Sequence, residues 1–295
     1  SWRSKAPLIY RNTPQWFISM EKKDLRNIAL KSIDETIFYP PQGQTRLRSM
    51  IETRPDWCVS RQRVWGVPLP LFINKKTGQP LRDQKIIDRI ADIYEKEGSN
   101  TWFTEDPQRF LGEEYSSSDF EQVKDVVEVW FDSGSTHAFC LEQRQDLKWP
   151  ASMYLEGSDQ HRGWFHSSLL ESSGTRGKAP YESVLTHGFV VDGKGRKMSK
   201  SLGNVISPDD ILKQYGVDIL RLWVVASDYY DDLKLDKDIL KAQAESYRRI
   251  RNTFRFLIGN LNNFNKDETI DENKFPELEK SLLHRLWEVD QIIKK

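Results

Sequence analysis

The sequence predicts an α/β fold with a parallel sheet, followed by a helical region. Three short apolar runs, at residues 126–131, 152–159 and 183–191, alternate with segments of helical periodicity. This alternation is typical of parallel strands joined by crossover helices. Glycines and polar residues follow each run, at the position where doubly wound sheets bind their ligands. We therefore expect a ligand site at the carboxyl ends of these strands.

The region before the first run mixes strand-like and helical patterns. Short strands and one helix are predicted near the N-terminus, at residues 8–10, 15–20 and 22–31. Residues 73–125 are predicted to form an inserted α+β segment, because a turn at 75–78 and a helix over 83–96 interrupt the apolar runs. The α/β part is therefore expected to carry one insertion.

The region after residue 206 is predicted to be helical. Ser207 can cap a helix, Pro208 suits its first turn, and Gly216 suits its end. A longer helix is predicted over residues 237–262, with an apolar stripe along one face. The stripe consists of Tyr247, Ile250, Phe254, Leu257, Ile258 and Leu261. We therefore expect a helical bundle after the α/β part.

The bulk composition narrows the classes of function. The chain has 295 residues and a formal net charge of zero, so any contact with nucleic acid has to use local basic patches. Its two cysteines, Cys58 and Cys140, are far apart, which argues against a disulfide framework and fits a reducing cytosol. No apolar run approaches membrane length, and the first residues do not form a signal-peptide pattern. We expect a cytoplasmic protein with no membrane contact.

One stretch, residues 193–210, is basic and rich in glycine. Most charge runs of this kind are solvated faces. The alternative is a mobile clamp for phosphates, because Lys197 and Lys200 are three positions apart and can point the same way. Glycines let backbone approach a ligand closely, and nucleotidyl transfer needs mobile positive charge where negative charge builds up. The glycine spacing of a Walker loop is absent from the sequence.

Residues Lys197, Met198, Ser199, Lys200 and Ser201 spell KMSKS, the signature of class I aminoacyl-tRNA synthetases. Five more segments occur in the order and spacing of isoleucyl-tRNA synthetases: DWCVSRQRVWG (56–66), VWFDSGS (129–135), MYLEGSDQHRGWF (153–165), LTHGF (185–189) and SYRRIRNTFRF (246–256). The chain therefore resembles the isoleucyl-tRNA synthetases over nearly its whole length. This resemblance favours the phosphate clamp over the solvated loop.

The resemblance implies a division of the chain into three parts. Residues 56–225 would be the second half of a Rossmann-like class I catalytic domain, with the insertion at about 73–125 and the KMSKS loop at 193–204. Residues 1–55 would be the tail of the connective, or editing, insertion. Residues 226–295 would contact the tRNA stem and begin a helical anticodon-binding domain.

The activity implied is that of an isoleucine–tRNA ligase. ATP with Mg²⁺ and L-isoleucine would give isoleucyl-AMP and pyrophosphate, with Lys197 and Lys200 stabilising the pyrophosphate side, and tRNA(Ile) would then accept the isoleucyl group. The HIGH-type histidine pair of the family is absent, and residues 1–4 are Ser-Trp-Arg-Ser where some relatives carry a zinc-binding Cys-Trp-Arg-Cys. We expect a fragment of a monomeric enzyme, without a zinc site, that catalyses poorly by itself. Two alternatives remain, a non-catalytic paralogue that binds nucleotide or tRNA and a subunit of a split synthetase.

Two segments carry the candidate adenylate-binding residues. Carboxylates and a glycine at a strand end can bind ribose hydroxyls and let a sugar approach closely. The resemblance assigns adenylate contacts to Glu156, Gly157, Asp159, Gln160, His187 and Gly188. From the residues alone, Ser158 or Asp159 could instead cap the following helix, and His187 could be a core histidine.

Two tryptophans, Trp130 and Trp164, stand just after predicted strands. Tryptophans at such positions are usually part of the core. The resemblance implies instead that both line the pocket for the isoleucine side chain. Of the nearby histidines, His161 is expected beside the site and His166 is expected to be structural.

Five arginines are candidate tRNA contacts. Arg61 and Arg63 belong to the SRQR segment, which the resemblance places near the tRNA acceptor end. Arg248, Arg251 and Arg255 lie at spacings of three and four along the long predicted helix and could reach phosphates. Ordinary surface ion pairs are the alternative for the first pair, and an exposed helix face is the alternative for the other three.

Overall fold

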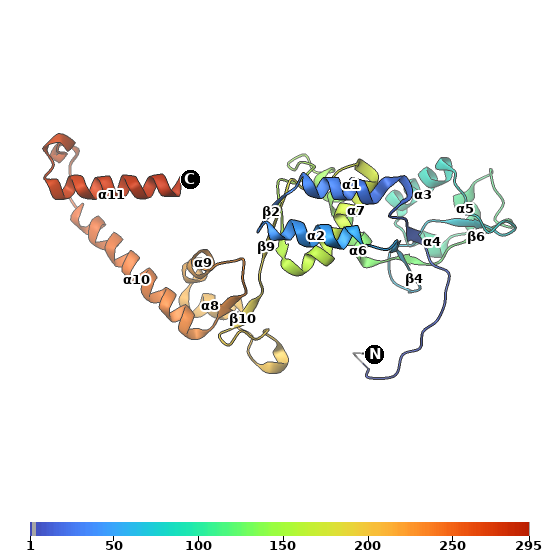
Figure 1. The fold of residues 1–295 in the computed structure, drawn as a ribbon, viewed down its shortest axis with the longest axis horizontal. Helices are drawn as coiled ribbons and strands as arrows, with labels where there is room; N and C mark the ends of the chain where they lie inside the picture. The colour runs from blue at the N-terminus through green and yellow to red at the C-terminus, as the bar shows by residue number, and fades with distance from the viewer. Residues whose placement is uncertain (2–3, 295) are drawn as a thin grey trace. The chain divides into compact units, whose positions relative to one another are not determined.

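The computed structural model describes residue 1 and residues 4–294 (Figure 1). The chain forms two compact units. The first contains residues 1–189 and 229–233, and the second contains residues 190–228 and 234–295. The expected loss of a zinc knuckle at residues 1–4 concerns positions that lie partly outside the described residues.

A three-stranded parallel sheet lies at the centre of the first unit. Its strands are β2 (Ile37–Tyr39), β9 (Ser183–His187) and β8 (Tyr154–Gly157), in that order. In the parallel register Gly157 is opposite His187, so the carboxyl ends of β8 and β9 coincide. The predicted parallel sheet is confirmed, although β2 was not expected, because a run of three residues is too short to be recognised as a strand.

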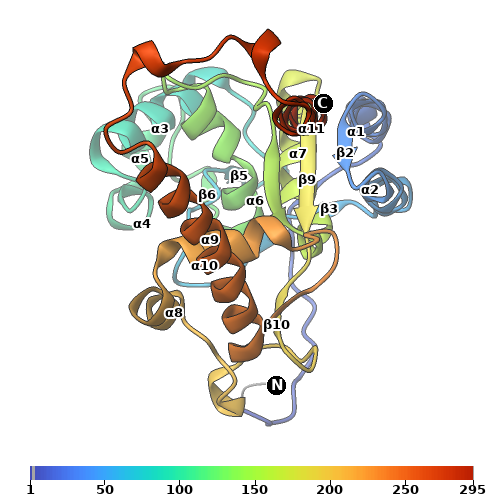
Figure 2. The ribbon, with the colours of Figure 1, turned by 90° about the vertical axis from the view of Figure 1, so that its left-hand side faces the viewer.

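Helices cover this sheet and provide most of the core. They are α1 (Leu25–Asp34), α2 (Gln42–Glu52), α6 (Val129–Gly134) and α7 (Trp164–Arg176). Helix α1 packs against both α2 and α7, and Figures 1 and 2 show α1 and α2 side by side. The completely buried side chains include Met20, Ala29, Ile33, Leu47, Ile51, Phe165 and Leu169. Burial of the larger side chains in this set contributes about 1.5–3 kcal/mol each, and such burial is the main stabilising term for this unit.

The segment predicted to be an insertion has a small core of its own. It contains the antiparallel pair β5 (Phe72–Asn74) and β6 (Phe120–Gln122) and the helices α3 (Gln84–Glu97), α4 (Thr101–Thr104) and α5 (Pro107–Leu111). Its core consists of Phe72, Ile86, Ile90, Trp102, Phe110 and Leu111. The predicted helix over 83–96 is confirmed by α3, which Asp83 caps by accepting a hydrogen bond from the backbone N–H of Lys85 at 2.9 Å.

One predicted strand of the parallel sheet is wrong. The run at 126–131 forms only a two-residue strand, β7 (Val126–Val127), which pairs antiparallel with β4 (Ser60–Arg61), and α6 begins directly after it. Glu128 causes the change, because its buried carboxylate accepts hydrogen bonds from Trp130 N at 3.2 Å and from Trp57 Nε1 at 2.8 Å. The first of these bonds caps α6.

Two smaller predictions also need correction. Residues 8–10 form no strand, and Ile9 and Tyr10 are 90% and 100% exposed. The run at 183–191 divides at Gly188 into β9 and β10 (Val190–Asp192). By contrast, the expected strand at 15–20 is present as β1 (Phe17–Ile18), paired with β3 (Trp57–Cys58), and the expected helix at 22–31 is present as α1.

The second unit is mainly helical. Helices α8 (Pro208–Tyr215), α9 (Val217–Ala226) and α10 (Lys237–Asn260) pack in sequence, and α11 (Glu277–Ile293) follows. Strands β10 and β11 (Leu233–Leu235) form a two-stranded sheet. The predicted cap is confirmed, since Ser207 Oγ accepts a hydrogen bond from Asp210 N at 3.2 Å. Short helical turns complete the chain at Lys22–Asp24 (η1), His137–Leu141 (η2), Ser158–Arg162 (η3), Lys200–Leu202 (η4), Lys266–Glu268 (η5) and Glu272–Lys274 (η6).

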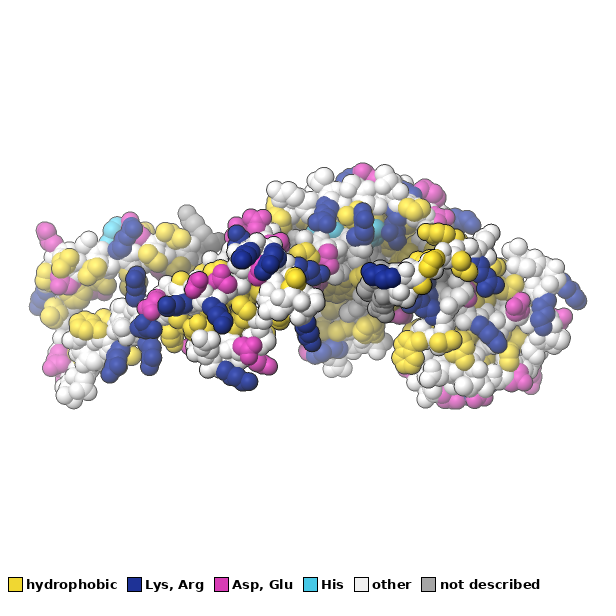
Figure 3. All heavy atoms as spheres, turned by 90° about the horizontal axis from the view of Figure 1, so that it is seen from below, with side chains coloured by type: hydrophobic (Ala, Val, Ile, Leu, Met, Phe, Trp, Pro, Cys, Tyr) yellow, Lys and Arg dark blue, Asp and Glu magenta, His cyan; other side chains and the backbone are white. Residues whose placement is uncertain are grey.

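The apolar stripe of α10 stays at the surface. Ile250, Phe254 and Leu257 are 48%, 60% and 51% exposed. Figure 3 shows yellow hydrophobic side chains at the surface of this helical region, toward its left end. Neither α10 nor any other helix of the described residues combines the length and the apolar character that crossing a bilayer requires.

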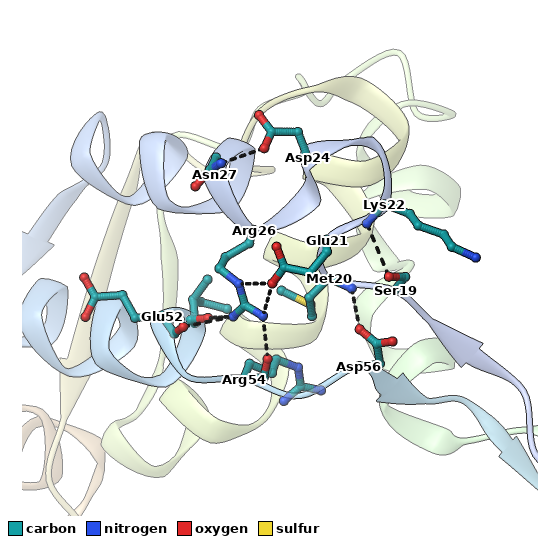
Figure 4. A network of polar contacts seen from close by, with 11 residues as sticks. Ser19, Met20, Glu21, Lys22, Asp24, Arg26, Asn27, Glu52, Arg54 and Asp56 are labelled. Carbon is teal, nitrogen blue, oxygen red and sulfur yellow. Dashed lines mark hydrogen bonds and ion pairs between the residues drawn. The ribbon is translucent and has the colours of Figure 1, made fainter.

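A network of polar contacts ties the start of α1 to the end of α2 in the first unit (Figure 4). The guanidinium of Arg26 donates hydrogen bonds to the carbonyl oxygens of Ile51 at 2.6 Å, Glu52 at 3.0 Å and Arg54 at 2.9 Å. It also pairs with the carboxylate of Glu21 at 2.7 Å. Arg26 therefore gives a charged donor to three carbonyl groups at the end of α2 and in the residues just after it.

Replacing Arg26 with alanine is expected to lower the free energy of unfolding of the first unit by about 3 kcal/mol, because several carbonyl groups lose a charged donor. Urea unfolding followed by tryptophan fluorescence measures this loss. Arg48→Ala is the matched control, since Arg48 makes only surface ion pairs with Asp34 and Glu52, and it should cost less than about 1 kcal/mol. Equal losses from the two variants would contradict the capping role of Arg26.

Candidate active site

A single carboxylate organises the basic hairpin that contains KMSKS. Asp192, the last residue of β10, accepts hydrogen bonds from Lys194 N at 3.0 Å, from Arg196 N and Nε at 2.9 Å each, and from Asn204 Nδ2 at 3.0 Å. The bond from Asn204 and the bonds from Arg196 hold the pKa of the Asp192 carboxyl well below its usual range. The two ends of the hairpin are thus joined through one side chain.

The KMSKS residues themselves form a short turn. Ser199 N donates to Asn204 Oδ1 at 2.9 Å, and Ser199 Oγ accepts from Leu202 N at 3.3 Å at the start of η4. Lys197 and Lys200 take part in none of the ion pairs formed by the described residues. Their ammonium groups are therefore free of carboxylate partners in this part of the chain and can meet an anionic ligand.

Removal of the Asp192 carboxylate should loosen this hairpin. In Asp192→Ala the amides of Lys194 and Arg196 lose their acceptor, so we expect their hydrogen exchange to become at least about tenfold faster. Exchange followed by NMR or mass spectrometry gives the measurement, with Asp209→Ala as the control, because Asp209 is an exposed acid in the first turn of α8. Unchanged exchange at both amides would contradict the organising role of Asp192.

The predicted adenylate residues meet at the carboxyl end of the parallel sheet. Glu156 and Gly157 end β8, and Asp159 and Gln160 follow in η3. A Cβ atom on Gly157 would lie 2.8 Å from Asp159 Oδ1, so only glycine lets this carboxylate fold back over the strand end. The alternative cap at Ser158 or Asp159 is not found, because neither η3 nor α7 has a side-chain cap from these residues.

The LTHGF segment stands beside this group. His187 lies opposite Gly157 in the sheet, and its Nδ1 donates to the carbonyl oxygen of Gly188 at 2.7 Å. Gly188 has no room for a side chain, since a Cβ atom would lie 2.2 Å from the carbonyl oxygen of Asp231. Five of the six candidate adenylate residues are thus placed along β8, η3 and the end of β9, and Gly188 packs against the returning chain.

The two predicted pocket tryptophans have different environments. Trp164 stacks on Tyr154 with ring centroids 4.1 Å apart, and its Nε1 donates to the carbonyl oxygen of Ser133 at 3.1 Å. Trp130 is 42% exposed and lies against Gly163, where a Cβ atom would come within 2.8 Å of the indole. Trp164 is therefore half-buried and held by two contacts, whereas Trp130 is more exposed.

Trp130 lines a cavity of about 250 Å³ in the first unit. The other lining residues are Arg54, Trp57, Arg61, Glu128, Arg162, Gly163, His166 and Ser167. Three guanidinium groups against one carboxylate give the cavity a positive character that suits an anionic group. Burial lowers the pKa of the His166 imidazole to about 3, so this side chain is neutral.

Sequence reasoning missed several of these residues. Arg54 and Arg162 reach the cavity from α2's end and from η3, and no local pattern distinguishes them from other surface arginines. Asn204 was expected to belong to the KMSKS loop, and only the fold shows that its side chain meets that of Asp192. A conspicuous aspartate directly before the glycine-rich stretch was the one available signal for this pair.

The candidate tRNA contacts are placed in both units. Arg61 pairs with Glu128 at 3.6 Å and lines the cavity, whereas Arg63 is exposed. On α10, Arg248 is exposed and pairs with Glu245 at 2.8 Å. Arg251 and Arg255 are exposed and belong to none of the ion pairs within the described residues.

Within residues 1 and 4–294, no group of three or more His, Cys, Asp and Glu side chains is arranged to hold a metal ion. The hairpin lysines and the strand-end carboxylates are the groups that could contact a nucleotide, through phosphates and ribose respectively.

Known proteins similar to this chain are synthetases. Pelagibacter ubique isoleucine–tRNA ligase is 65% identical over the whole chain, which covers 33% of that protein. The isoleucine–tRNA ligase of Mesorhizobium japonicum is 55% identical over the whole chain and covered over 30% of its length. The chain thus spans about a third of the length of the curated relatives it matches.

Two solved structures share the fold. One is the ternary complex of Agrobacterium radiobacter LeuRS with tRNA and LeuAMS, with a TM-score of 0.51, 20% identity, and coverage of 74% of this chain and 30% of that one. The other is Mycobacterium tuberculosis methionyl-tRNA synthetase with methionyl-adenylate, with a TM-score of 0.51, 18% identity, and coverage of 82% and 39%. A family model described as tRNA synthetases class I (I, L, M and V) matches residues 4–236. Since this match includes most of the chain, the protein belongs to the class I tRNA synthetase family.

Proposed function

We propose that this chain forms part of the catalytic machinery of an isoleucine–tRNA ligase. The reaction joins L-isoleucine to ATP as isoleucyl-AMP and then transfers the isoleucyl group to tRNA(Ile). The observation that supports isoleucine over the other amino acids of the family is the similarity of the whole chain to proteins named isoleucine–tRNA ligase, at 65% and 55% identity.

In the first step, a carboxylate oxygen of isoleucine attacks the α-phosphorus of ATP. The bond from the α-phosphorus to the bridging oxygen breaks, and negative charge builds up on the departing pyrophosphate. Lys197 and Lys200 stabilise this charge. This role is supported by the fact that neither lysine belongs to an ion pair of the described residues. ATP enters with Mg²⁺, which shields the phosphates.

The strand-end group holds the adenylate. Glu156 and Asp159 offer carboxylate oxygens to the ribose hydroxyls, and Gly157 gives the sugar room to approach. Gln160, His187 and Gly188 complete the contacts at the same edge. Trp130 and Trp164 form walls of the isoleucine pocket, and the bond from Trp164 to the carbonyl oxygen of Ser133 holds its ring in place.

Arginines provide the contacts to tRNA(Ile). Arg61 and Arg63 meet the acceptor end, and Arg248, Arg251 and Arg255 meet backbone phosphates from α10. Within the chain, residues 1–55 belong to the connective insertion, 56–225 to the catalytic domain, and 226–295 to the stem-contact and anticodon-binding region. The enzyme acts as a monomer in the cytoplasm.

A chimera tests this function. The part of Pelagibacter ubique isoleucine–tRNA ligase that aligns with this chain, about a third of that enzyme, is replaced by residues 1–295. We expect the chimera to charge tRNA(Ile) with isoleucine at a rate within about tenfold of the unaltered relative, since the exchanged segments are 65% identical. A soluble, folded chimera that charges no tRNA would contradict the proposal.

A further inference from the structure

The basic hairpin of the second unit begins beside the first turn of α10. Its strand β10 pairs with β11, and Asp236 follows β11 directly as the N-cap residue of α10. One carboxylate oxygen of Asp236, Oδ1, accepts a hydrogen bond from Ile239 N at 2.8 Å. The carboxylate also stands at the positive end of the helix dipole, where negative charge is stabilised. The position of the Asp236 side chain is therefore fixed by the helix that it caps.

The second carboxylate oxygen of Asp236 covers Gly193, the first residue of the hairpin turn. A Cβ atom on Gly193 would overlap with Asp236 Oδ2, and it would lie 2.9 Å from Cγ and 3.2 Å from Cβ of the same side chain. Gly193 is not among the glycines with a positive φ, so its backbone conformation is one that alanine can adopt. Space, rather than backbone conformation, therefore requires glycine at this position, and Asp236 is the residue that takes up the space.

Backbone pairing connects this contact to the KMSKS residues. Asp192 N donates to the carbonyl oxygen of Arg196 at 2.9 Å, which joins the two arms of the hairpin. Val191, which is buried, forms an antiparallel bridge with Lys197. Lys197 is thus paired with β10 just beyond the turn that begins at Gly193, and η4 follows it in the chain. A displacement of Gly193 away from α10 would therefore move Lys197 as well.

We propose that Gly193 and Asp236 are positioning residues, whose contact seats the basic hairpin on α10 and so holds Lys197 and Lys200 in place for the reaction. Their role in the reaction rests on the proposed function, whereas the contact itself lies within the second unit. Both residues act through the hairpin rather than on a substrate. If Gly193 were needed only to form the turn, removing the Asp236 carboxylate would not relieve the effect of a side chain at that position.

Hydrogen exchange on the whole chain, followed by NMR, tests the contact without reference to any activity. We expect Gly193→Ala to speed exchange of the Asp192 amide by at least about tenfold, because the added methyl group displaces the hairpin from α10. In the Asp236→Ala background the same change should have an effect of less than about threefold, because the nearest atom of that residue is then its Cβ. Gly259→Ala is the control within α10, since a Cβ atom there has no neighbour within 4 Å.

Two results of this experiment would overturn the proposal. One is an equal effect of Gly193→Ala with and without the Asp236 carboxylate. The other is faster exchange at the Ile239 amide alone, which would show that the carboxylate gives way while the hairpin stays in place. If Gly193→Ala fails to fold, recovery of a folded chain on adding Asp236→Ala would support the proposal, and a double variant that also fails to fold would overturn it.

The chimera links the contact to the reaction. Gly193→Ala should lower the kcat of isoleucine-dependent ATP–pyrophosphate exchange by at least about tenfold, with the KM for isoleucine changed by less than about threefold, and adding Asp236→Ala should restore most of the loss. An active chimera in which Gly193→Ala has no effect would overturn the positioning role and leave the proposed function standing. A chimera without any exchange would overturn the proposed function, and hydrogen exchange on the chain would then decide whether Asp236 positions the hairpin.

Discussion

In the chimera, Lys200→Ala is expected to slow isoleucyl-AMP formation by about 10²–10³-fold, while the KM for isoleucine changes by less than about threefold. Lys200 opens the η4 turn of the basic hairpin and has no carboxylate partner there. Its charge is therefore available for the pyrophosphate that forms in the transition state. Isoleucine does not carry that charge, so its binding should be nearly unaffected.

The measurement is ATP–pyrophosphate exchange as a function of isoleucine and ATP concentration. Lys194→Ala is the matched control, because Lys194 lies in the same hairpin and contacts Asp192 only through its backbone N–H. We expect that control to keep at least about a third of the activity. Equal losses in kcat and in isoleucine affinity for Lys200→Ala would contradict the assignment of Lys200 to the pyrophosphate.

Glu171→Gln is expected to stabilise the first unit at alkaline pH and to have little effect in acid. Burial raises the pKa of Glu171 to about 9 in the folded chain, against an ordinary value of 4.5. Above the ordinary value the unfolded chain releases this proton whereas the folded chain keeps it, so the stability of the unaltered chain falls as pH rises from about 4.5 to 9. The uncharged glutamine removes this dependence.

Urea unfolding at about pH 8 and about pH 4 measures the effect. A group whose proton is held only in the folded state lowers the free energy of unfolding by about 1.4 kcal/mol for each pH unit. We therefore expect Glu171→Gln to have a free energy of unfolding about 2 kcal/mol or more above that of the unaltered chain at the higher pH. Glu182→Gln provides the control, because that carboxylate is exposed. The same stability difference at both pH values would show that Glu171 is ionised in the folded chain.

Local sequence patterns correctly predicted those helices and strands whose conformation depends mainly on residues close together in the sequence. The apolar runs that became β8 and β9, the helix α3 and the cap of α8 follow from neighbouring side chains. The strand predicted at 126–131 was wrong because a tertiary contact determines the structure of this segment. Glu128 is buried by Trp57, which lies far away in sequence, and this burial makes Glu128 a helix cap.

The residues of the candidate site also fall into two groups, those that the sequence predicted and those that only the fold brings together. KMSKS and the strand-end residues around Glu156 are contiguous, so their motifs were visible in the sequence. The carboxylate of Asp192 and the amide of Asn204 are joined across twelve positions of chain, at 3.0 Å. Arg54 and Arg162 come together from separate elements around one cavity. Such convergence depends on the fold, and a single sequence contains no signal for it.

The most direct test of the central claim is amino-acid-dependent ATP–pyrophosphate exchange by the chimera, with isoleucine, valine and leucine compared at equal concentrations. The account predicts exchange that is fastest with isoleucine, is slower with valine and leucine, and falls by about 10²–10³-fold in Lys200→Ala. Exchange that prefers valine or leucine, or that is indifferent to Lys200, would contradict the assignment of this chain to isoleucine activation.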